Sequence, residues 1–325
     1  MVDPNRSVVC IGECLVDLIA EDRKDLMRAD RFMIREGGAP ANVSVALARL
    51  GVPVKLCAVV GRDPFGYRLR DLLDREGVDT RALRMTSEAA TSLALAWTND
   101  RGDGEFQLLR MADRLLSDTD ADNARPTEAA ALVAGSVVLS DRESRRGAVA
   151  ALDLATSNGV PVVFDLNLRP TLWRSMDQAR IAIEQFLYSA RLIKVSMDDA
   201  RGVWGAETPE AVFGRLEQYP ARTIVITDGG RGVWYRNERQ EPHYLPVYPV
   251  EVVEPTGAGD AFTAAITARM LERGWMPAED DDIRFAMAAG ALATTKAGAW
   301  PGLPTRRAIE SFLRERGQAR GVASS

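Results

Sequence analysis

The residues best suited to chemistry lie between Val252 and Phe262, where a β-prone run ends at Pro255 and a small-residue turn precedes a predicted helix. Such a turn points unpaired backbone N–H groups at one place, and the helix dipole adds positive charge there. Gly257-Ala258-Gly259 is therefore a candidate anion hole suited to phosphate. Asp260 follows directly and could act as a general base that takes a proton from an attacking hydroxyl. An ordinary turn capped by an aspartate explains the segment about equally well.

This turn does not match the common nucleotide-binding loops. Its Gly-x-Gly lacks the third glycine of the dinucleotide fingerprint and lies late in the chain, which disfavours a nicotinamide-dependent oxidoreductase. The chain contains no Gly-Lys-Ser or Gly-Lys-Thr, so a Walker A loop is excluded.

Three further segments place polar groups where a ligand could bind. Gly37-Gly38-Ala39-Pro40-Ala41-Asn42 opens a predicted helix; Asn42 could cap that helix or hydrogen-bond a sugar hydroxyl, although a capped loop is slightly favoured. Gly12-Glu13-Cys14-Leu15-Val16-Asp17 carries two carboxylates at the end of a predicted strand, where open α/β sheets bind ligands. Thr227-Asp228-Gly229-Gly230-Arg231-Gly232 predicts a turn between two strands, which alone would be an ordinary hairpin.

The composition excludes several other classes of protein. The 325 residues carry 41 basic and 46 acidic side chains, a net charge of −5 with no basic stripe, which argues against a nucleic-acid or anionic-membrane surface. His243 is the only histidine, so histidine triads and multi-histidine metal sites are excluded. Three cysteines (Cys10, Cys14 and Cys57) suit a reducing cytosol. Because no membrane-length apolar run or signal-peptide pattern is visible, we expect a cytoplasmic protein.

The elements that must position these residues alternate between short strands and amphipathic helices. Runs typical of strands buried on both faces are Val8–Gly12, Val54–Gly61, Ser136–Ser140, Val160–Leu166, Leu192–Ser196 and Thr223–Thr227. One helix is predicted over Asp63–Glu76, with Asp63 as its N-cap, and another from near Asn42 to Gly51. Glu279–Asp282 is interpreted as the acidic start of a helix. The alternation predicts a three-layer α/β fold, with a central, mostly parallel sheet flanked by helices.

Residues 14–36 and 91–112 break this alternation with short alternating patterns and no good crossover helix. Such patterns fit a small sheet with one solvated face, and we predict that both segments form a β-sheet lid on a single domain spanning residues 1–325. A second subunit covering the exposed lid sheet would give a homodimer. The small, polar segment 317–325 is predicted to be frayed.

In combination and order, these motifs resemble those of the ribokinase-like sugar kinases, the PfkB family. The six matching elements are Gly12–Asp17, Gly37–Asn42, Val60–Gly66, Asp165–Arg169, Thr227–Gly232 and Thr256–Asp260. Each is weak or moderate alone, but six in family order form a strong signal that covers most of the chain. The resemblance implies ATP-dependent phosphorylation of a sugar's primary hydroxyl, with the two irregular segments forming the family's β lid.

The resemblance also implies roles for individual residues. Asp260 would be the base, and Gly257, Ala258 and Gly259 would form the hole for the transferred phosphoryl group. The sugar would be held by Asp17, Gly37, Gly38 and Asn42, with Arg110 and Arg169 reaching the sugar or the transferred phosphate. The nucleotide would lie along Ser196, Thr227, Gly229 and Gly232, together with Gly257 and Gly259.

Two departures from the family pattern affect the metal ions that accompany ATP. Ser196-Met197-Asp198-Asp199 stands where the family has Asn-x-x-Glu, so Asp199 would organise Mg²⁺ through water with a side chain one methylene shorter. Glu254 replaces the family's first aspartate and could bind K⁺, but Gly302 offers no side-chain oxygen where ribokinases have a serine.

Three segments bear on the choice of sugar. Asp165–Trp173, Gly37–Asn42 and Arg110–Asp113 look most like those of bacterial fructokinases and 2-keto-3-deoxygluconate kinases. Phosphorylation of D-fructose to fructose 6-phosphate is the first expectation; 2-keto-3-deoxygluconate is the closest rival substrate, with ribose or nucleosides behind. A non-catalytic relative that senses a sugar is an alternative of a different class, which the intact Asp260 and glycine turn disfavour.

Overall fold

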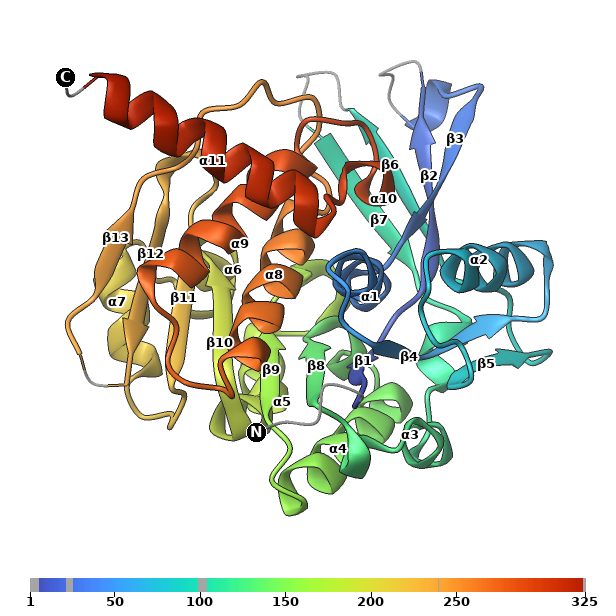
Figure 1. Ribbon diagram of the computed structural model, residues 1–325. Coiled ribbons are helices and arrows are strands. Elements are labelled where there is room, and N and C mark those ends of the chain that lie inside the picture. Colours follow the sequence, from blue (N-terminus) through green and yellow to red (C-terminus); the bar gives the residue numbers. More distant parts are fainter. Residues whose placement is uncertain (1–5, 22–25, 99–103, 239, 324–325) are drawn as a thin grey trace.

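The computed structural model describes residues 6–21, 26–98, 104–238 and 240–323. Within these residues, nine strands form one sheet in the order β13-β12-β11-β10-β9-β8-β1-β4-β5 (Figure 1). The parallel strands are β1 (Val8–Ile11), β4 (Val54–Gly61), β5 (Leu83–Thr86), β8 (Ala131–Gly135), β9 (Val162–Asp165), β10 (Ala190–Ser196) and β11 (Thr223–Thr227). Antiparallel β12 (Val233–Asn237) and β13 (His243–Leu245) complete one edge.

Helices cover both faces of this sheet, so the predicted three-layer α/β architecture is confirmed (Figure 1). One face packs against α1 (Ala39–Arg49), α2 (Pro64–Arg75), α8 (Ala258–Glu272), α9 (Asp280–Ala293), α10 (Ala299–Gly302) and α11 (Arg306–Ala323). The other packs against α3 (Asp118–Ala124), α4 (Arg142–Ser157), α5 (Met176–Ser189), α6 (Met197–Trp204) and α7 (Pro209–Leu216).

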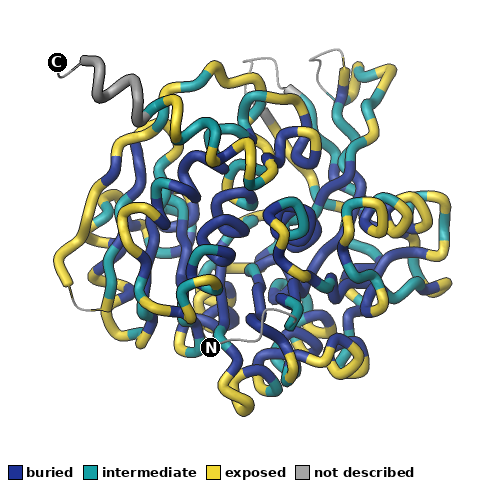
Figure 2. Tube along the Cα trace, in the orientation of Figure 1, coloured by how far each residue is buried: buried dark blue, intermediate teal, exposed yellow. Residues whose placement is uncertain are grey.

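The two helix layers bury alternate side chains of the strands between them. In β1, Val8 and Cys10 belong to one hydrophobic core, whereas Val9 and Ile11 belong to the other. Successive side chains of a strand point to opposite faces, so a strand covered on both sides must be apolar throughout. Figure 2 shows this burial concentrated on the large sheet and the helices that face it.

Helix ends agree with the sequence prediction where a local cap specifies them. The Asp63 side chain accepts a hydrogen bond from the Gly66 N–H at 2.9 Å and caps α2, as predicted. Glu279 is the N-cap of α9, and the acidic residues after it occupy the first turn, where they complement the helix dipole.

Three local predictions differ from the structure. The strand predicted over Ser136–Ser140 is β8, five residues earlier, and Val137–Leu139 forms a 3₁₀ turn that is buried just as deeply, so hydrophobicity alone could not separate them. Helix α1 starts at Ala39, because Pro40 suits a first helical turn; Asn42 therefore lies inside the helix and does not cap it. Helix α11 continues to Ala323, through most of the segment predicted to be frayed.

A second sheet forms from the two segments that interrupt the alternation. Its order is β3-β2-β6-β7, with β2 (Leu15–Ala20), β3 (Phe32–Gly37), β6 (Leu93–Thr98) and β7 (Gly104–Leu109). The prediction of a small sheet from these residues is confirmed, and Figure 1 shows it beside the carboxyl end of β1. Its action as a lid and its use in a homodimer stay predictions.

No helix in the described ranges has the length and hydropathy needed to cross a membrane. Cys10, Cys14 and Cys57 are buried free thiols.

Candidate active site

The small-residue turn lies at the start of α8, as predicted. Gly257 is the N-cap residue, and its φ of 82° is a left-handed conformation that glycine adopts without strain. A Cβ on Gly257 would lie 3.1 Å from the Cα of Ala299, so the turn packs closely against α10. Asp260 therefore stands in the first turn of α8, beside backbone N–H groups that have no partner within the helix.

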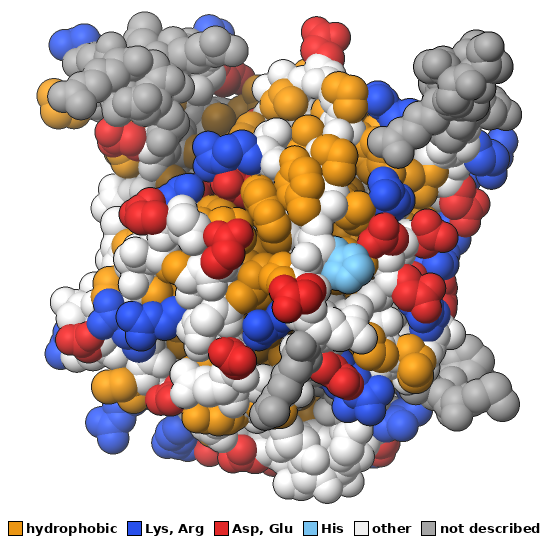
Figure 3. Space-filling view, turned by 90° about the vertical axis from the view of Figure 1, so that its left-hand side faces the viewer, with side chains coloured by type: hydrophobic (Ala, Val, Ile, Leu, Met, Phe, Trp, Pro, Cys, Tyr) orange, Lys and Arg blue, Asp and Glu red, His pale blue; other side chains and the backbone are white. Residues whose placement is uncertain are grey.

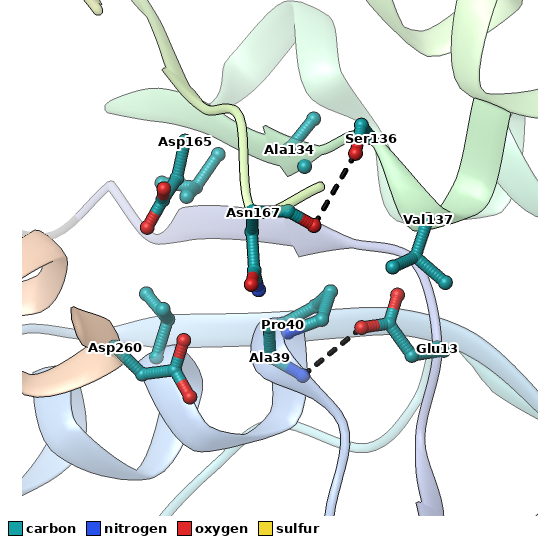
Figure 4. A pocket seen from close by; sticks show the side chains of 12 residues that line it. Glu13, Ala39, Pro40, Ala134, Ser136, Val137, Asp165, Asn167 and Asp260 are labelled. Carbon is teal, nitrogen blue, oxygen red and sulfur yellow. Dashed lines mark hydrogen bonds between the residues drawn. The ribbon is translucent and has the colours of Figure 1, made fainter. Parts of the chain in front are cut away.

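A small cavity of about 20 Å³ lies next to Asp260 at the carboxyl ends of the parallel strands (Figure 4). Its polar wall comes from Glu13 after β1, Ser136 after β8, Asp165 at the end of β9, Asn167, and Asp260 itself. Open α/β sheets bind ligands at this end of their strands. Figure 4 shows the carboxylates of Glu13, Asp165 and Asp260 placed around this space.

A second, open cleft of about 440 Å³ adjoins the first on the other side of the α8 turn. Thr227, Gly229 and Gly232, predicted to lie along the nucleotide, all line it, together with residues 247–252 and the facing surfaces of α8 and α9. Figure 3 shows hydrophobic side chains gathered in a band on this side of the molecule, beside the single histidine. An apolar cleft of this size suits a flat, partly apolar ligand such as a nucleotide base.

The two hollows meet at consecutive residues. Ala258 and Gly259 line the open cleft, and Asp260 lines the smaller cavity. A group bound at the N-terminus of α8 would therefore be within reach of ligands on both sides, with the Asp260 carboxylate on the side of the smaller one.

The electrostatic surroundings of Asp260 favour proton exchange near neutrality. Burial raises the pKa of Asp260 to about 6, and Asp165 adds to the rise. The hydrogen bond from Asn42 and the positive charges of Lys194 and Arg169 act in the opposite direction. A carboxyl group with such a pKa is largely ionised at pH 7 and still basic enough to accept a proton.

The predicted sugar-binding residues converge on the same place. Asp17, on β2, is close enough to Asp260 for their charges to interact. Burial raises the pKa of Asp17 to about 7, and the negative charges of Glu254 and Asp260 add to the rise. A Cβ on Gly37 would lie 2.4 Å from an Asp17 carboxylate oxygen, which explains the glycine there. Asn42 donates from Nδ2 to Asp260 Oδ2 at 2.7 Å.

Glu13 has a structural partner within the cavity wall. Its Oε1 accepts a hydrogen bond from the Ala39 N–H at 3.0 Å, so its carboxylate serves the first turn of α1, where the N-cap Gly38 has no side chain. Gly38 has a φ of 98°, and a Cβ there would lie 2.5 Å from the Glu13 carbonyl oxygen.

The two arginines predicted to reach the ligands differ in their surroundings. The charge of Arg169 lowers the pKa of both Asp17 and Asp260, and its guanidinium lies 6.0 Å from the ring centroid of Phe106 on the small sheet. Arg110 does not line the cavity; its guanidinium donates to the Asp113 carboxylate.

The other donors of Arg110 are also used within the protein. They bond to the Val137 carbonyl oxygen and to the Ser140 and Ser144 hydroxyls, and the side chain is 6% exposed. Arg110 therefore joins the end of β7 to α4 and the turn before it, a long-range contact that its sequence neighbours could not indicate.

Sequence reasoning missed a buried ion pair between the two hollows. Lys194 on β10 donates to both oxygens of Asp165, at 3.0 and 2.9 Å, and Thr263 on α8 donates to Asp165 at 2.6 Å. A Cβ on Gly259 would lie 3.0 Å from Lys194 Nζ, so this ammonium stands directly behind the α8 turn. A lysine inside an otherwise apolar strand run was the available signal.

The comparison with protein families agrees with this arrangement. Residues 5–306 match the model of the pfkB family of carbohydrate kinases. The chain belongs to this family. The cavity, the open cleft and the α8 turn all lie within the residues that match this model.

This pfkB kinase is similar to known fructokinases over nearly the full length of both chains. The fructokinase of Salmonella typhimurium is 32% identical over 313 residues, covering 93% of this chain and 98% of that protein. The ATP-bound fructokinase structure from Xylella fastidiosa has a TM-score of 0.85 and 30% identity, covering 96% of this chain and 99% of that one. A double mutant of Vibrio cholerae fructokinase with bound fructose, ADP and potassium ion has a TM-score of 0.83 and 27% identity, covering 96% and 100%.

Asp199 of the pfkB kinase caps a helix, and its predicted role in organising Mg²⁺ through water stays a prediction. Its Oδ1 accepts from the Leu168 N–H at 2.8 Å and its Oδ2 from the Ser196 N–H at 3.1 Å, while Ser196 Oγ accepts from the Asp199 N–H at 3.0 Å. The two residues form the capping box of α6, and both Asp199 oxygens are used. Ser196 still pairs with Thr227 at the adjoining ends of β10 and β11.

K⁺ binding by Glu254 stays a prediction. Glu254 accepts a hydrogen bond from the Gly298 N–H at 2.9 Å, which ties it to the loop before α10. Gly302 has no room for a serine, because a Cβ there would lie 2.3 Å from the Ala293 carbonyl oxygen. Among the residues that the structure describes, no group of three or more His, Cys, Asp and Glu side chains could hold a metal ion.

Proposed function

We propose that this pfkB kinase is an ATP-dependent fructokinase that transfers the γ-phosphoryl group of ATP to the 6-hydroxyl of D-fructose. The observation that carries the proposal is the meeting of two hollows at Gly259 and Asp260, a small one bordered by the carboxylates of Glu13, Asp165 and Asp260 and a larger one suited to a nucleotide. The full-length similarity to fructokinases supports fructose as the sugar.

The catalytic step follows from the placement of the α8 turn. The 6-hydroxyl oxygen attacks the γ-phosphorus while its proton passes to Asp260, and the bond from the γ-phosphorus to the bridging oxygen breaks, leaving ADP. The backbone N–H groups of Gly257 and Gly259 stabilise the charge on the transferred group, whereas the Ala258 N–H already donates to the Pro255 carbonyl oxygen at 3.2 Å. Lys194, behind Gly259, adds positive charge on the same side. Mg²⁺ bound with ATP would neutralise phosphate charge, held mainly by phosphates and water.

A panel of sugars tests the substrate assignment. Purified protein with Mg-ATP is assayed for ADP release and for kcat/KM with D-fructose, 2-keto-3-deoxygluconate and ribose, and the product position is read by NMR. We expect D-fructose to have the highest kcat/KM and to be phosphorylated at O6. A kcat/KM for 2-keto-3-deoxygluconate tenfold above that for fructose would overturn the assignment of fructose as substrate but not the kinase activity. If none of the sugars caused ADP release, the proposed function would be contradicted.

Replacing Asp17 tests the sugar side of the cavity. Asp17→Ala should raise the KM for fructose about 10- to 100-fold, because charge-assisted hydrogen bonds to sugar hydroxyls contribute about 1.5–3 kcal/mol each. The KM for ATP, measured with the same preparation, should change little, because Asp17 does not line the nucleotide cleft. Equal changes in the two constants would assign Asp17 a structural role.

A further inference from the structure

A chain of hydrogen bonds from three helices ends on the candidate base. The indole Nε1 of Trp300 on α10 donates to Asn42 Oδ1 at 2.8 Å, and Asn42 Nδ2 on α1 donates to Asp260 Oδ2 on α8 at 2.7 Å. Asn42 and Trp300 are 5% and 4% exposed, so water does not compete strongly for these bonds.

The indole determines which way the Asn42 amide faces. An indole N–H can only donate, so it must meet the amide oxygen, and the amide NH₂ is then turned toward Asp260. An NH₂ group favours the ionised carboxylate, which can only accept. Without the indole N–H, the amide could turn over and present its oxygen to a protonated Asp260, which would stabilise the acid form.

Trp300 is itself held firmly in place. Its carbonyl oxygen accepts from Arg49 Nη1 at 2.6 Å, and the same nitrogen donates to the Leu303 carbonyl oxygen at 2.7 Å. Arg49, at the end of α1, is also ion-paired with Glu76. Helix α10 thus connects the far end of α1 to the turn before Asp260, which Ala299 contacts.

We propose that Trp300 is a positioning residue for the phosphoryl transfer, because through Asn42 it holds Asp260 in the ionised, proton-accepting state. The inference rests on the proposed role of Asp260 as the base. Trp300 lines neither hollow, and Asn42 is its hydrogen-bonded connection to Asp260.

Several charged groups also face Asp260 and set its titration. Asp165 on β9 raises its pKa, Lys194 on β10 and Arg169 after β9 lower it, and Asp17 on β2 interacts with it. None of these groups is altered by a change at Trp300, so a shift on removing the indole N–H reports on Asn42.

Trp300→Phe removes the N–H and keeps most of the apolar volume. The acid limb of the pH dependence of kcat, measured with saturating fructose so that the titration of Asp17 is suppressed, should move to higher pH by about half to one unit, because Asp260 loses a fixed donor to its charged form. Trp275→Phe is the matched control: Trp275 is 2% exposed and its indole nitrogen has no hydrogen-bond partner among the described residues. That variant should leave the limb in place.

A second background shows whether the effect passes through Asn42. In Asn42→Ala protein, adding Trp300→Phe should move the limb no further. An unmoved limb in Trp300→Phe alone, or an equal shift in both backgrounds, would overturn the proposal.

A measurement without turnover separates this inference from the proposed function. In ¹⁵N-labelled protein, the Trp300 indole resonance, assigned by its loss in Trp300→Phe, should titrate with a midpoint near pH 6 and stop titrating in Asp260→Asn. An indole resonance that titrates in the same way in Asp260→Asn as in the wild type would overturn the proposed role of Trp300, even if the protein is an active kinase. If the indole resonance titrates with Asp260 but the protein phosphorylates no sugar, the hydrogen-bonded coupling of Trp300 to Asp260 is supported and the proposed function is contradicted.

Discussion

Asp260→Asn is expected to lower kcat by roughly 10² to 10⁴, the usual cost of losing a general base. The asparagine is nearly the same shape and can still accept the hydrogen bond from Asn42, so the fold and the affinity for ATP should stay near wild type. It cannot take a proton from the sugar hydroxyl, and the only histidine of the chain, His243, lies on β13 at the sheet edge and lines neither hollow.

The measurement is kcat with saturating Mg-ATP and fructose, together with the ATP dissociation constant from calorimetry. Asp198→Asn provides the control, because that carboxylate is 91% exposed and its ion pair is with Arg201 on its own helix. The control should keep wild-type turnover. Turnover of Asp260→Asn within a few-fold of wild type would remove Asp260 from the role of base.

Lys194→Met is expected to lower the free energy of unfolding by about 3–5 kcal/mol, the range for breaking a buried ion pair by removing one partner. Lys194 and Asp165 are each 5% exposed, and both carboxylate oxygens bond to the ammonium. Without the lysine, Asp165 remains as a buried charge supported by the Thr263 hydroxyl alone. Methionine fills most of the lost volume, so the loss reports on charge and not on a cavity.

Chemical denaturation followed by circular dichroism gives the free energy of unfolding. Adding Asp165→Asn should recover more than half of the loss, because an amide can still accept from Thr263 and carries no charge. Arg81→Met, which breaks the exposed ion pair with Asp79, should leave stability close to wild type. A Lys194→Met protein as stable as Arg81→Met would show that the buried pair is not needed for folding.

The architecture and the centre of the site could be predicted because their signals are local. Valine-rich runs between capped helices identify a covered parallel sheet, and the cap at Asp63 marks a helix start on its own. The turn Gly257–Gly259 followed by Asp260 combines glycine conformations, unpaired N–H groups and a carboxylate within four residues. The strand predicted at Ser136–Ser140 was wrong, because one apolar run covers both a strand and a turn and its hydrophobicity does not mark the boundary between them.

Only the tertiary structure decided what each polar side chain contacts. Asn42 was expected to be a cap or a sugar ligand, yet it bonds to Asp260, 218 residues away, and to Trp300, 258 residues away. Both carboxylate oxygens of Asp199 accept hydrogen bonds from backbone N–H groups, and Lys194 forms its ion pair with a residue on a neighbouring strand. A buried polar group must find a hydrogen-bond partner, and packing of distant elements supplies that partner. The sequence by itself therefore determined the covered sheet, the capped start of α2 and the small-residue turn before α8, whereas the charge state and orientation of the groups around that turn depended on the assembled fold.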